Sequence, residues 1–223
     1  SMGASINKSS VIHPGVDLNR FFSAPPSSNL QHSLGIAPSD KVLLFMGTIF
    51  RFSGLVELLT ELAPELHRDP FLKFLILGDG EDLGRVNATV SQFGLHKQVI
   101  TPGRIEYNIL ADHLRLGHVA LIPFEQTLVT HGALPGKVLQ YLACGIPTIA
   151  YPLNGLMSVL KNDQGVIYAN TSTIMVAEAI DIMGNPLKQQ GISIKGSESM
   201  FEHFNWDQQI EIFENLLYSL TFN

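Results

Sequence analysis

The sequence has little charge, and this scarcity excludes several classes of protein. Of its 223 residues only 15% are Asp, Glu, Lys or Arg, against roughly 25% in typical soluble domains. The 14 Lys and Arg are outnumbered by 20 Asp and Glu, so the formal net charge is −6. A duplex nucleic-acid binder or a polybasic membrane-surface protein needs a cluster of positive charge. Both are excluded, as are collagen-like, coiled-coil and disordered chains. The deficit of charge itself requires an explanation.

Cysteine and long apolar runs are also scarce. Cys144 is the only cysteine, so no internal disulfide is possible and nothing indicates an oxidising compartment. The longest apolar runs, at 42–46 and 74–77, are far shorter than the ~20 residues of a membrane-spanning helix. The first residues lack the charged and apolar regions of a signal peptide. We therefore expect a cytoplasmic protein without a membrane span. Residues 1–10 are interpreted as a cloning remnant and linker, which suggests a piece of a longer chain.

From position 41 onward, short apolar runs alternate regularly with segments of helical period. Strands are expected at 42–46, 71–77, 99–101, 119–123, 147–151 and 165–168. Helices are expected between them at 54–66, 83–93, 107–116, 135–143 and 173–183. This alternation is typical of a parallel sheet covered on both faces. It predicts a doubly wound, Rossmann-like α/β domain, whose ligands bind at the carboxyl ends of the strands.

The two ends of the chain depart from this repeat. Residues 11–40 contain Pro14, Pro25, Pro26 and a Ser/Asn cluster, which favour a linker with little regular structure. Residues 185–223 begin with a Gly/Ser break and continue with a helical segment at 207–220. We therefore predict a core domain at 41–184, an interdomain hinge at 11–40 and a C-terminal helical extension at 185–223.

The loops after the first three strands contain glycines that favour a close approach of backbone to ligand. The first loop runs from Gly47 to Gly54 and is not a Walker loop, because Leu55 follows Gly54. Phosphate contact and simple turn scaffolding both remain open for it. The second, 78–84, is similar to a dinucleotide fingerprint, but Leu83 replaces the third glycine and its acidic residues would repel a pyrophosphate. A nicotinamide-dependent oxidoreductase is therefore disfavoured. The third, 102–105, either holds a flat base against its backbone or is an ordinary turn.

The loop after the fourth strand carries the most informative residue. Lys137 falls in the first turn of the helix expected from 135, where a cation opposes the helix dipole. Gly132 permits close backbone approach, and Pro135 is favoured in a first helical turn. The position of Lys137 indicates an anion at the helix start, with a solvated surface lysine as the alternative. His131 is the one histidine of eight retained as a site candidate, and no metal-ligand spacing is found.

Several of these segments together resemble the retaining glycosyltransferases of the GT-B fold, and more narrowly their family-four type, the glycosyl transferases group 1. The strongest carrier is LPGKVLQYLACGIPTIA at 134–150. The stretch 11–21 is similar to the hinge that leads into the C-terminal domain of that family, and 204–207 to its approach to a final helix. The likeness also covers 42–54, 78–80 and 102–104.

The resemblance implies half of an enzyme, because GT-B enzymes place the active site between two Rossmann-like domains. This chain resembles the C-terminal half, which binds the nucleotide-sugar donor, while an N-terminal domain binds most of the acceptor. The resemblance further implies a UDP- or GDP-type donor and a glycan or lipid-linked acceptor. Retention of configuration and no required metal or cofactor are also implied. The process would be biosynthesis of polysaccharide, lipopolysaccharide or glycolipid. The isolated domain is expected to be inactive. A peripheral position at the inner face of the membrane is an alternative to free cytoplasmic placement.

The resemblance also assigns roles to individual residues. The backbone near Arg104 would hold the base, Lys137 would pair with the diphosphate, and the sugar would lie over the loop 130–133. Preorganised donors and cations there would stabilise the charge on the departing nucleoside diphosphate. The predicted catalytic residues are Lys137 and Arg51. The predicted nucleotide-sugar contacts are Gly47, Thr48, Ser53, Gly54, Gly78, Gly103, Arg104, Ile105, Glu125, Thr130, His131, Gly132, Ala133, Leu134, Pro135, Val138 and Gln140.

The chain departs from the family pattern at several of these positions. Thr48 and Ser53 stand where the family often carries Arg and Lys, and Arg51 is the cation in the same loop that could substitute. Gln140 replaces the second glutamate of a two-glutamate motif, and Glu125 is the nearest candidate for the first. These changes leave two hypotheses. The chain belongs either to a subgroup that binds the phosphates with different residues or to a degenerate, non-catalytic binding module. A missing N-terminal domain would also explain the charge deficit, because the centres of interfaces are poor in charge.

Overall fold

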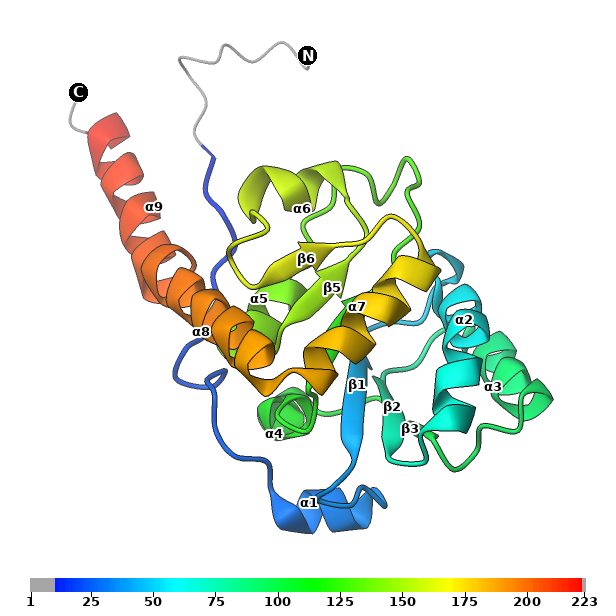
Figure 1. Ribbon diagram of the computed structural model, residues 1–223. Coiled ribbons are helices and arrows are strands. Elements are labelled where there is room, and N and C mark those ends of the chain that lie inside the picture. Colours follow the sequence, from blue (N-terminus) through cyan, green and yellow to red (C-terminus); the bar gives the residue numbers. More distant parts are fainter. Residues whose placement is uncertain (1–10, 222–223) are drawn as a thin grey trace.

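The computed structural model describes residues 11–221, so the interpretation of residues 1–10 lies outside the described part. Its centre is a six-stranded sheet with the strand order β3-β2-β1-β4-β5-β6, in which every pairing is parallel. The strands are β1 Lys41–Met46, β2 Leu72–Leu77, β3 Val99–Gly103, β4 Val119–Ile122, β5 Thr148–Ala150 and β6 Val166–Tyr168. Helices cover both faces of the sheet (Figure 1). This is the strand order of a doubly wound Rossmann-like sheet, and it confirms the predicted fold class.

The register of β1 determines where the sheet opens. β1 pairs with β2 at every position from Lys41↔Leu72 to Met46↔Leu77, whereas its pairing with β4 is confined to Leu43 and Leu44. The strand order reverses between β1 and β4, and open α/β sheets bind ligands at such a switch point. The carboxyl end of β1 therefore extends beyond its ladder with β4, next to the expected binding crevice.

Helices follow the strands in the predicted alternation. The longer ones between strands are α2 Leu55–Arg68 and α3 Leu83–Gln92, and α7 Ser172–Gly184 follows the last strand. α2 buries five leucines at helical spacing and packs against both α3 and α7. Shorter pieces are η2 Arg51–Ser53, η3 Tyr107–Ile109, α4 Leu110–Leu114, α5 Lys137–Ala143 and α6 Asn154–Val159. The sequence pattern did not predict α6, and α5 begins two residues later than expected. None of the described helices is long and apolar enough to cross a membrane.

The Gly/Ser break expected after position 185 is wrong, because α8 Pro186–His203 is a continuous helix. Asn185 caps its start, accepting a hydrogen bond from Lys188 N at 3.1 Å. Its small residues serve packing: a Cβ on Gly165 would lie only 2.5 Å from the Gly196 Cα, so the helix approaches the loop before β6 very closely. Tertiary contact therefore overrides the low helix propensity of glycine and serine.

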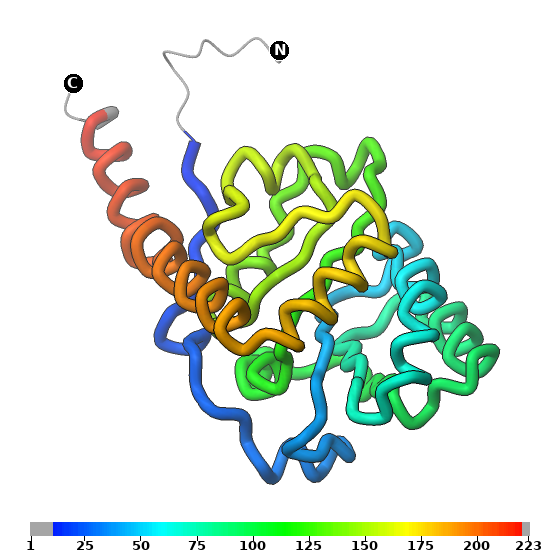
Figure 2. The backbone as a smooth tube through the Cα atoms, in the orientation of Figure 1, coloured from blue at the N-terminus to red at the C-terminus, as the bar shows by residue number. Residues whose placement is uncertain are grey.

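The front segment is attached to the domain rather than free. It contains one short helix, α1 Ser28–Ser33, capped by Ser27, and its Phe21 side chain is fully buried. Val16 N–H donates to the Phe204 carbonyl at 2.8 Å, so the beginning of the described chain runs beside the junction of α8 and α9 Trp206–Thr221. Figure 2 shows the blue and orange parts of the backbone meeting there. The hinge expected at 11–40 thus contributes to the core.

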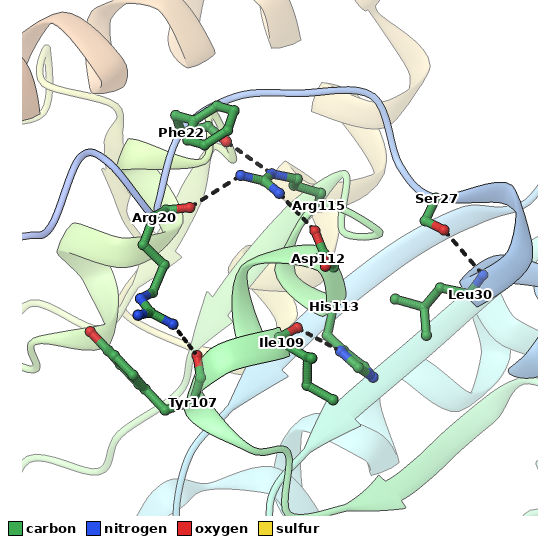
Figure 3. Close-up of polar contacts among 9 residues, drawn as sticks. All are labelled: Arg20, Phe22, Ser27, Leu30, Tyr107, Ile109, Asp112, His113 and Arg115. Atoms are coloured by element: carbon green, nitrogen blue, oxygen red, sulfur yellow. Dashed lines mark hydrogen bonds and ion pairs between the residues drawn. The ribbon is translucent and has the colours of Figure 1, made fainter.

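One arginine holds this segment on α4 (Figure 3). The Arg115 guanidinium donates to the Phe22 carbonyl at 3.0 Å, to the Arg20 carbonyl at 3.1 Å and to Asp112 at 2.8 Å. Its centre also lies 4.3 Å from the centroid of the Phe22 ring. The Arg115 side chain is only 10% exposed, whereas that of Asp112 is 55% exposed. Nothing in the local sequence pattern had indicated this role.

Candidate functional site

A cavity of about 460 Å³ lies at the carboxyl ends of β1, β2 and β3. Three loops and the start of α4 surround it. Its lining residues are Met46, Gly47, Thr48, Leu77, Gly78, Asp79, Gly80, Arg104, Ile105 and Leu110. The position agrees with the expectation that ligands of a doubly wound sheet bind at this edge.

Two glycines of the second loop are explained by the way this loop packs on the first. A Cβ on Gly78 would overlap the Gly47 carbonyl, and one on Gly80 would overlap the Ile49 backbone. Ile49 N–H donates to the Asp79 carbonyl at 2.9 Å, which ties the two loops together. The glycines at 78 and 80 are therefore required by contact between the loops.

Lys137 lies next to this cavity without lining it, and Arg104 is a cation in the lining itself. Its half-buried side chain reaches from the start of α5 to the end of β1, where the ammonium lies against Gly47. The Nζ atom is 4.7 Å from the ring centroid of Phe45 and 4.6 Å from that of Phe124. Within residues 11–221, no carboxylate oxygen lies within the 4.0 Å of an ion pair with it. Burial lowers the pKa of Lys137 to about 8, so the side chain is still mostly protonated at pH 7. Within the described chain this ammonium has no ion-pair partner.

Several predicted contact residues are brought together here. Gly47, Thr48, Gly78, Arg104 and Ile105 all line the cavity, although they come from three separate loops. Gly103 ends β3 directly beside them, and its carbonyl accepts from Gly78 N–H at 2.9 Å. Their individual roles toward a ligand stay predictions.

Three other predicted residues of the first loop do not line the cavity. Arg51 is exposed on η2. The Ser53 hydroxyl is fully buried, accepts from Phe50 N–H at 3.1 Å and donates to the Thr48 carbonyl at 3.3 Å. Gly54 packs against the Pro123 carbonyl. Ser53 and Gly54 therefore shape the loop that presents Thr48.

The predicted residues of the fourth loop lie beyond the cavity lining. Thr130 is buried, and its hydroxyl donates to the Glu125 carbonyl, whereas the Glu125 side chain is exposed. His131 Nε2 is 2.8 Å from Asn154 Nδ2 of α6. The carbonyls of Gly132 and Ala133 pack against Gly155. α6, which sequence analysis missed, thus supports the segment 130–133.

The remaining predicted residues flank Lys137 on α5 and before it. Val138 and Pro135 are buried, and Val138 N–H donates to the Pro135 carbonyl at 2.9 Å. Leu134 and Gln140 are half-buried. The Val138 side chain therefore belongs to the core. Sequence analysis did not assign Met46, Leu77, Asp79, Gly80 or Leu110 to the site, since their place in the lining depends on loop packing.

Fold and cavity together define a Rossmann-like, doubly wound domain with a cavity at the carboxyl ends of β1, β2 and β3. The family model for glycosyl transferases group 1 matches residues 27–190. This chain belongs to that family, which confirms the resemblance seen in the motifs at 42–54 and 134–150.

Known relatives agree with this assignment. The D-inositol 3-phosphate glycosyltransferase of Xylanimonas cellulosilytica is 26% identical over 92% of this chain, which corresponds to 50% of that protein. Across the solved structures, HepE from Anabaena in complex with UDP and glucose has 17% identity and a TM-score of 0.82, covering 97% of this chain and 58% of HepE. The C-terminal domain of LpcC, a glycosyl transferase group 1 family protein from Francisella tularensis, has 18% identity and a TM-score of 0.70 over 86% of this chain and 99% of that domain. The chain spans about half the length of the curated relatives it matches.

Proposed function

We propose that this chain is the donor-binding domain of a glycosyltransferase. The donor would be a nucleoside-diphosphate sugar of the UDP or GDP type, and the acceptor a glycan or a lipid-linked sugar. The sugar would be transferred with retention, in the biosynthesis of a polysaccharide, lipopolysaccharide or glycolipid. Membership of the glycosyl transferases group 1 supports the reaction class, and the UDP in the HepE structure supports the choice of UDP as first probe.

The observation that carries the proposal is the ammonium of Lys137, which has no ion-pair partner in the described chain and lies beside the cavity. A half-buried charge without a counter-ion is costly unless a ligand supplies the opposite charge. A diphosphate between Lys137 and the first loop would supply it, and Thr48 is the adjacent hydroxyl that can donate to a phosphate oxygen. Lys137 would then stabilise the negative charge that develops as the nucleoside diphosphate leaves. The base would lie against the backbone at Arg104 and Ile105.

A further domain would complete the active site. Trp206, Ile210 and Phe213 on α9 are 49%, 40% and 48% exposed, and apolar side chains grouped on a surface commonly mark an interaction site. An N-terminal domain packed there would also bind the acceptor. We therefore expect the domain alone to bind a nucleoside diphosphate and to transfer no sugar.

Calorimetric titration with UDP, GDP and ADP tests the binding claim. Lys137→Ala should weaken the binding of the diphosphate much more than that of the nucleoside, because only the diphosphate needs the ammonium. Lys188→Ala is the matched control, since Lys188 of α8 is paired with Glu178 and Asp181 of α7, none of which lines the cavity. Equal losses for diphosphate and nucleoside would remove Lys137 from the phosphate site, and no binding of any diphosphate at millimolar concentration would overturn the proposal.

The second candidate is a non-catalytic binding module on the same fold. It is favoured by Thr48, Ser53 and Gln140, which replace charged residues of the family pattern. Ser53 is already engaged inside its loop, so it cannot replace a phosphate-binding lysine. Assay of the full-length protein with nucleotide sugars and its acceptor separates the two candidates, because the module would bind a donor without turnover.

A further inference from the structure

Tyr141 of α5 is fully buried, and its hydroxyl contacts one residue of β1 twice. Met46 N–H donates to the Tyr141 Oη at 2.6 Å, and the Oη is 3.4 Å from the Met46 carbonyl, to which it donates. Met46 is the last residue of β1 and lines the cavity. The tyrosine hydroxyl is therefore attached to the backbone at the edge of the candidate site.

Among the described strands, the backbone groups of Met46 have no partner on the β4 side of β1, and the Tyr141 hydroxyl takes that place. Gly47 N–H donates toward β2, to the Leu77 carbonyl at 2.8 Å, so the backbone groups of the preceding residue face the other side. There the ladder between β1 and β4 is confined to Leu43 and Leu44. The polar groups of Met46 need a partner other than the sheet, and Tyr141 provides it for both.

The same face of α5 carries Lys137, one helical turn before Tyr141. Residues four apart lie above one another on a helix. The Lys137 ammonium lies against Gly47 and over the Phe45 ring, while Tyr141 binds Met46 between them. Two side chains of α5 thus contact three successive residues at the end of β1.

The geometry points to Tyr141 as a positioning residue for the proposed diphosphate site, which Lys137 and the Gly47–Thr48 backbone would form. Its hydroxyl locks α5 against the end of β1, and this contact sets the place of the Lys137 ammonium and of the Gly47–Thr48 backbone relative to one another. The inference rests on the proposed function, in which Lys137 and the first loop bind a diphosphate. Tyr141 does not line the cavity and would not touch the ligand itself.

Tyr141→Phe tests the inference, because it retains the buried ring and removes only the hydroxyl. The matched control is Tyr168→Phe, which removes a hydroxyl that donates to the Leu160 carbonyl at 2.8 Å. Tyr168 lies on the edge strand β6, at the other end of the sheet from β3. Tyr141→Phe loses two hydrogen bonds between a tyrosine hydroxyl and the backbone, and Tyr168→Phe loses one. The two variants also differ in whether those bonds lie at the candidate site.

Two measurements are made on each variant. Amide hydrogen exchange followed by NMR should show faster exchange of the Met46 amide in Tyr141→Phe, by about tenfold or more, and unchanged exchange there in Tyr168→Phe. Titration should show UDP bound about tenfold more weakly by Tyr141→Phe, with uridine nearly unaffected, because a small misplacement of the cation affects only the phosphates. A merely structural loss would weaken both ligands alike or appear equally in the control.

The outcomes separate this inference from the proposed function. Unchanged Met46 exchange, or UDP affinity equal to that of the wild type, overturns the role of Tyr141 alone. Failure of the wild type to bind UDP, GDP or ADP overturns the proposed function. It also overturns the role of Tyr141 at the diphosphate site, whatever the exchange data show. Loss of UDP affinity together with faster Met46 exchange, both confined to Tyr141→Phe, supports the inference.

Discussion

The Lys137 ammonium occupies the space into which a side chain at Gly47 would project. A Cβ at position 47 would overlap Lys137 Nζ and lie 3.0 Å from Cε, and the backbone φ of Gly47 is +136°. The end of β1 thus depends on glycine for its conformation and for its contact with the cation. If Lys137 binds a diphosphate as proposed, we expect ligand binding and local stability to be coupled at this point.

Gly47→Ala is expected to displace Lys137 and weaken UDP binding. The strained backbone should also lower the free energy of unfolding by about 1–3 kcal/mol. Calorimetry and urea denaturation measure the two effects. Gly94→Ala is the control, because Gly94 has a φ of +64° and a methyl group there would meet no atom of the described chain within 4 Å. It should lose stability and keep the wild-type affinity, and a similar loss of affinity in both variants would contradict the displacement of Lys137.

UDP affinity should fall as the pH rises through the pKa of Lys137. Burial lowers that pKa to about 8, so above pH 8 the free protein must take up a proton to present an ammonium to the phosphate. The dissociation constant should rise roughly tenfold between pH 7 and pH 9. Calorimetry across this range gives the profile. Lys137→Met should give a flat one, and a flat profile in the wild type would show that the ammonium does not bind the phosphate.

Acid should destabilise the domain through His118. Its Nδ1 accepts a hydrogen bond from Val42 N–H at 3.1 Å, and burial, followed by the charge of Lys41, lowers its pKa below 6.5. The unfolded chain then binds more protons than the folded one just below pH 6.5, so the free energy of unfolding falls with falling pH, at no more than about 1.4 kcal/mol per pH unit. Urea denaturation of the wild type and of His118→Asn, which retains an acceptor without the titration, isolates this contribution. Parallel curves would contradict it.

Arg115→Lys should loosen the front segment. A lysine cannot make the separate contacts with the Phe22 carbonyl, the Arg20 carbonyl and Asp112. We expect a loss of about 1–3 kcal/mol in the free energy of unfolding. The control is Arg68→Lys, because Arg68 forms an exposed ion pair with Glu65 and such pairs contribute little.

The reactivity of Cys144 provides a local measurement of how far Arg115→Lys loosens the front segment. It is buried beside the Phe22 backbone, and burial raises the pKa of its thiol to about 12. It should react slowly with iodoacetamide in the wild type and faster in Arg115→Lys, because the segment that covers it opens more often. An unchanged alkylation rate would show that Arg115 does not hold the segment in place.

The parts of the fold that could be predicted are those whose signals are local. The buried leucines of α2 recur every three or four residues, and strands such as β1 and β4 are short apolar runs, so the alternation of elements was correct. The helix α8 was not predicted, because glycine and serine have low helix propensity and the contact of Gly196 with Gly165 and Leu142 is tertiary. The short helix α6 carries no comparable periodicity.

The candidate site divides in the same way. The sequence indicated Lys137 and the loops at 47, 78 and 104, because residues after parallel strands gather at one edge of the sheet. It did not indicate that the Ser53 hydroxyl is used inside its own loop. Nor did it indicate the bond between Met46 and Tyr141, which are 95 positions apart.

The sequence by itself determined the class of fold, the family and the absence of an internal disulfide, since each follows from composition or from the order of short motifs. The tertiary structure alone decided the environment of Lys137: its burial, the aromatic rings beneath it and the lack of a carboxylate partner in the described chain. Burial and pairing depend on which distant segments pack together. The packing of α5 on β1 therefore adds a structural reason for the pairing with a diphosphate that the sequence already predicted for Lys137.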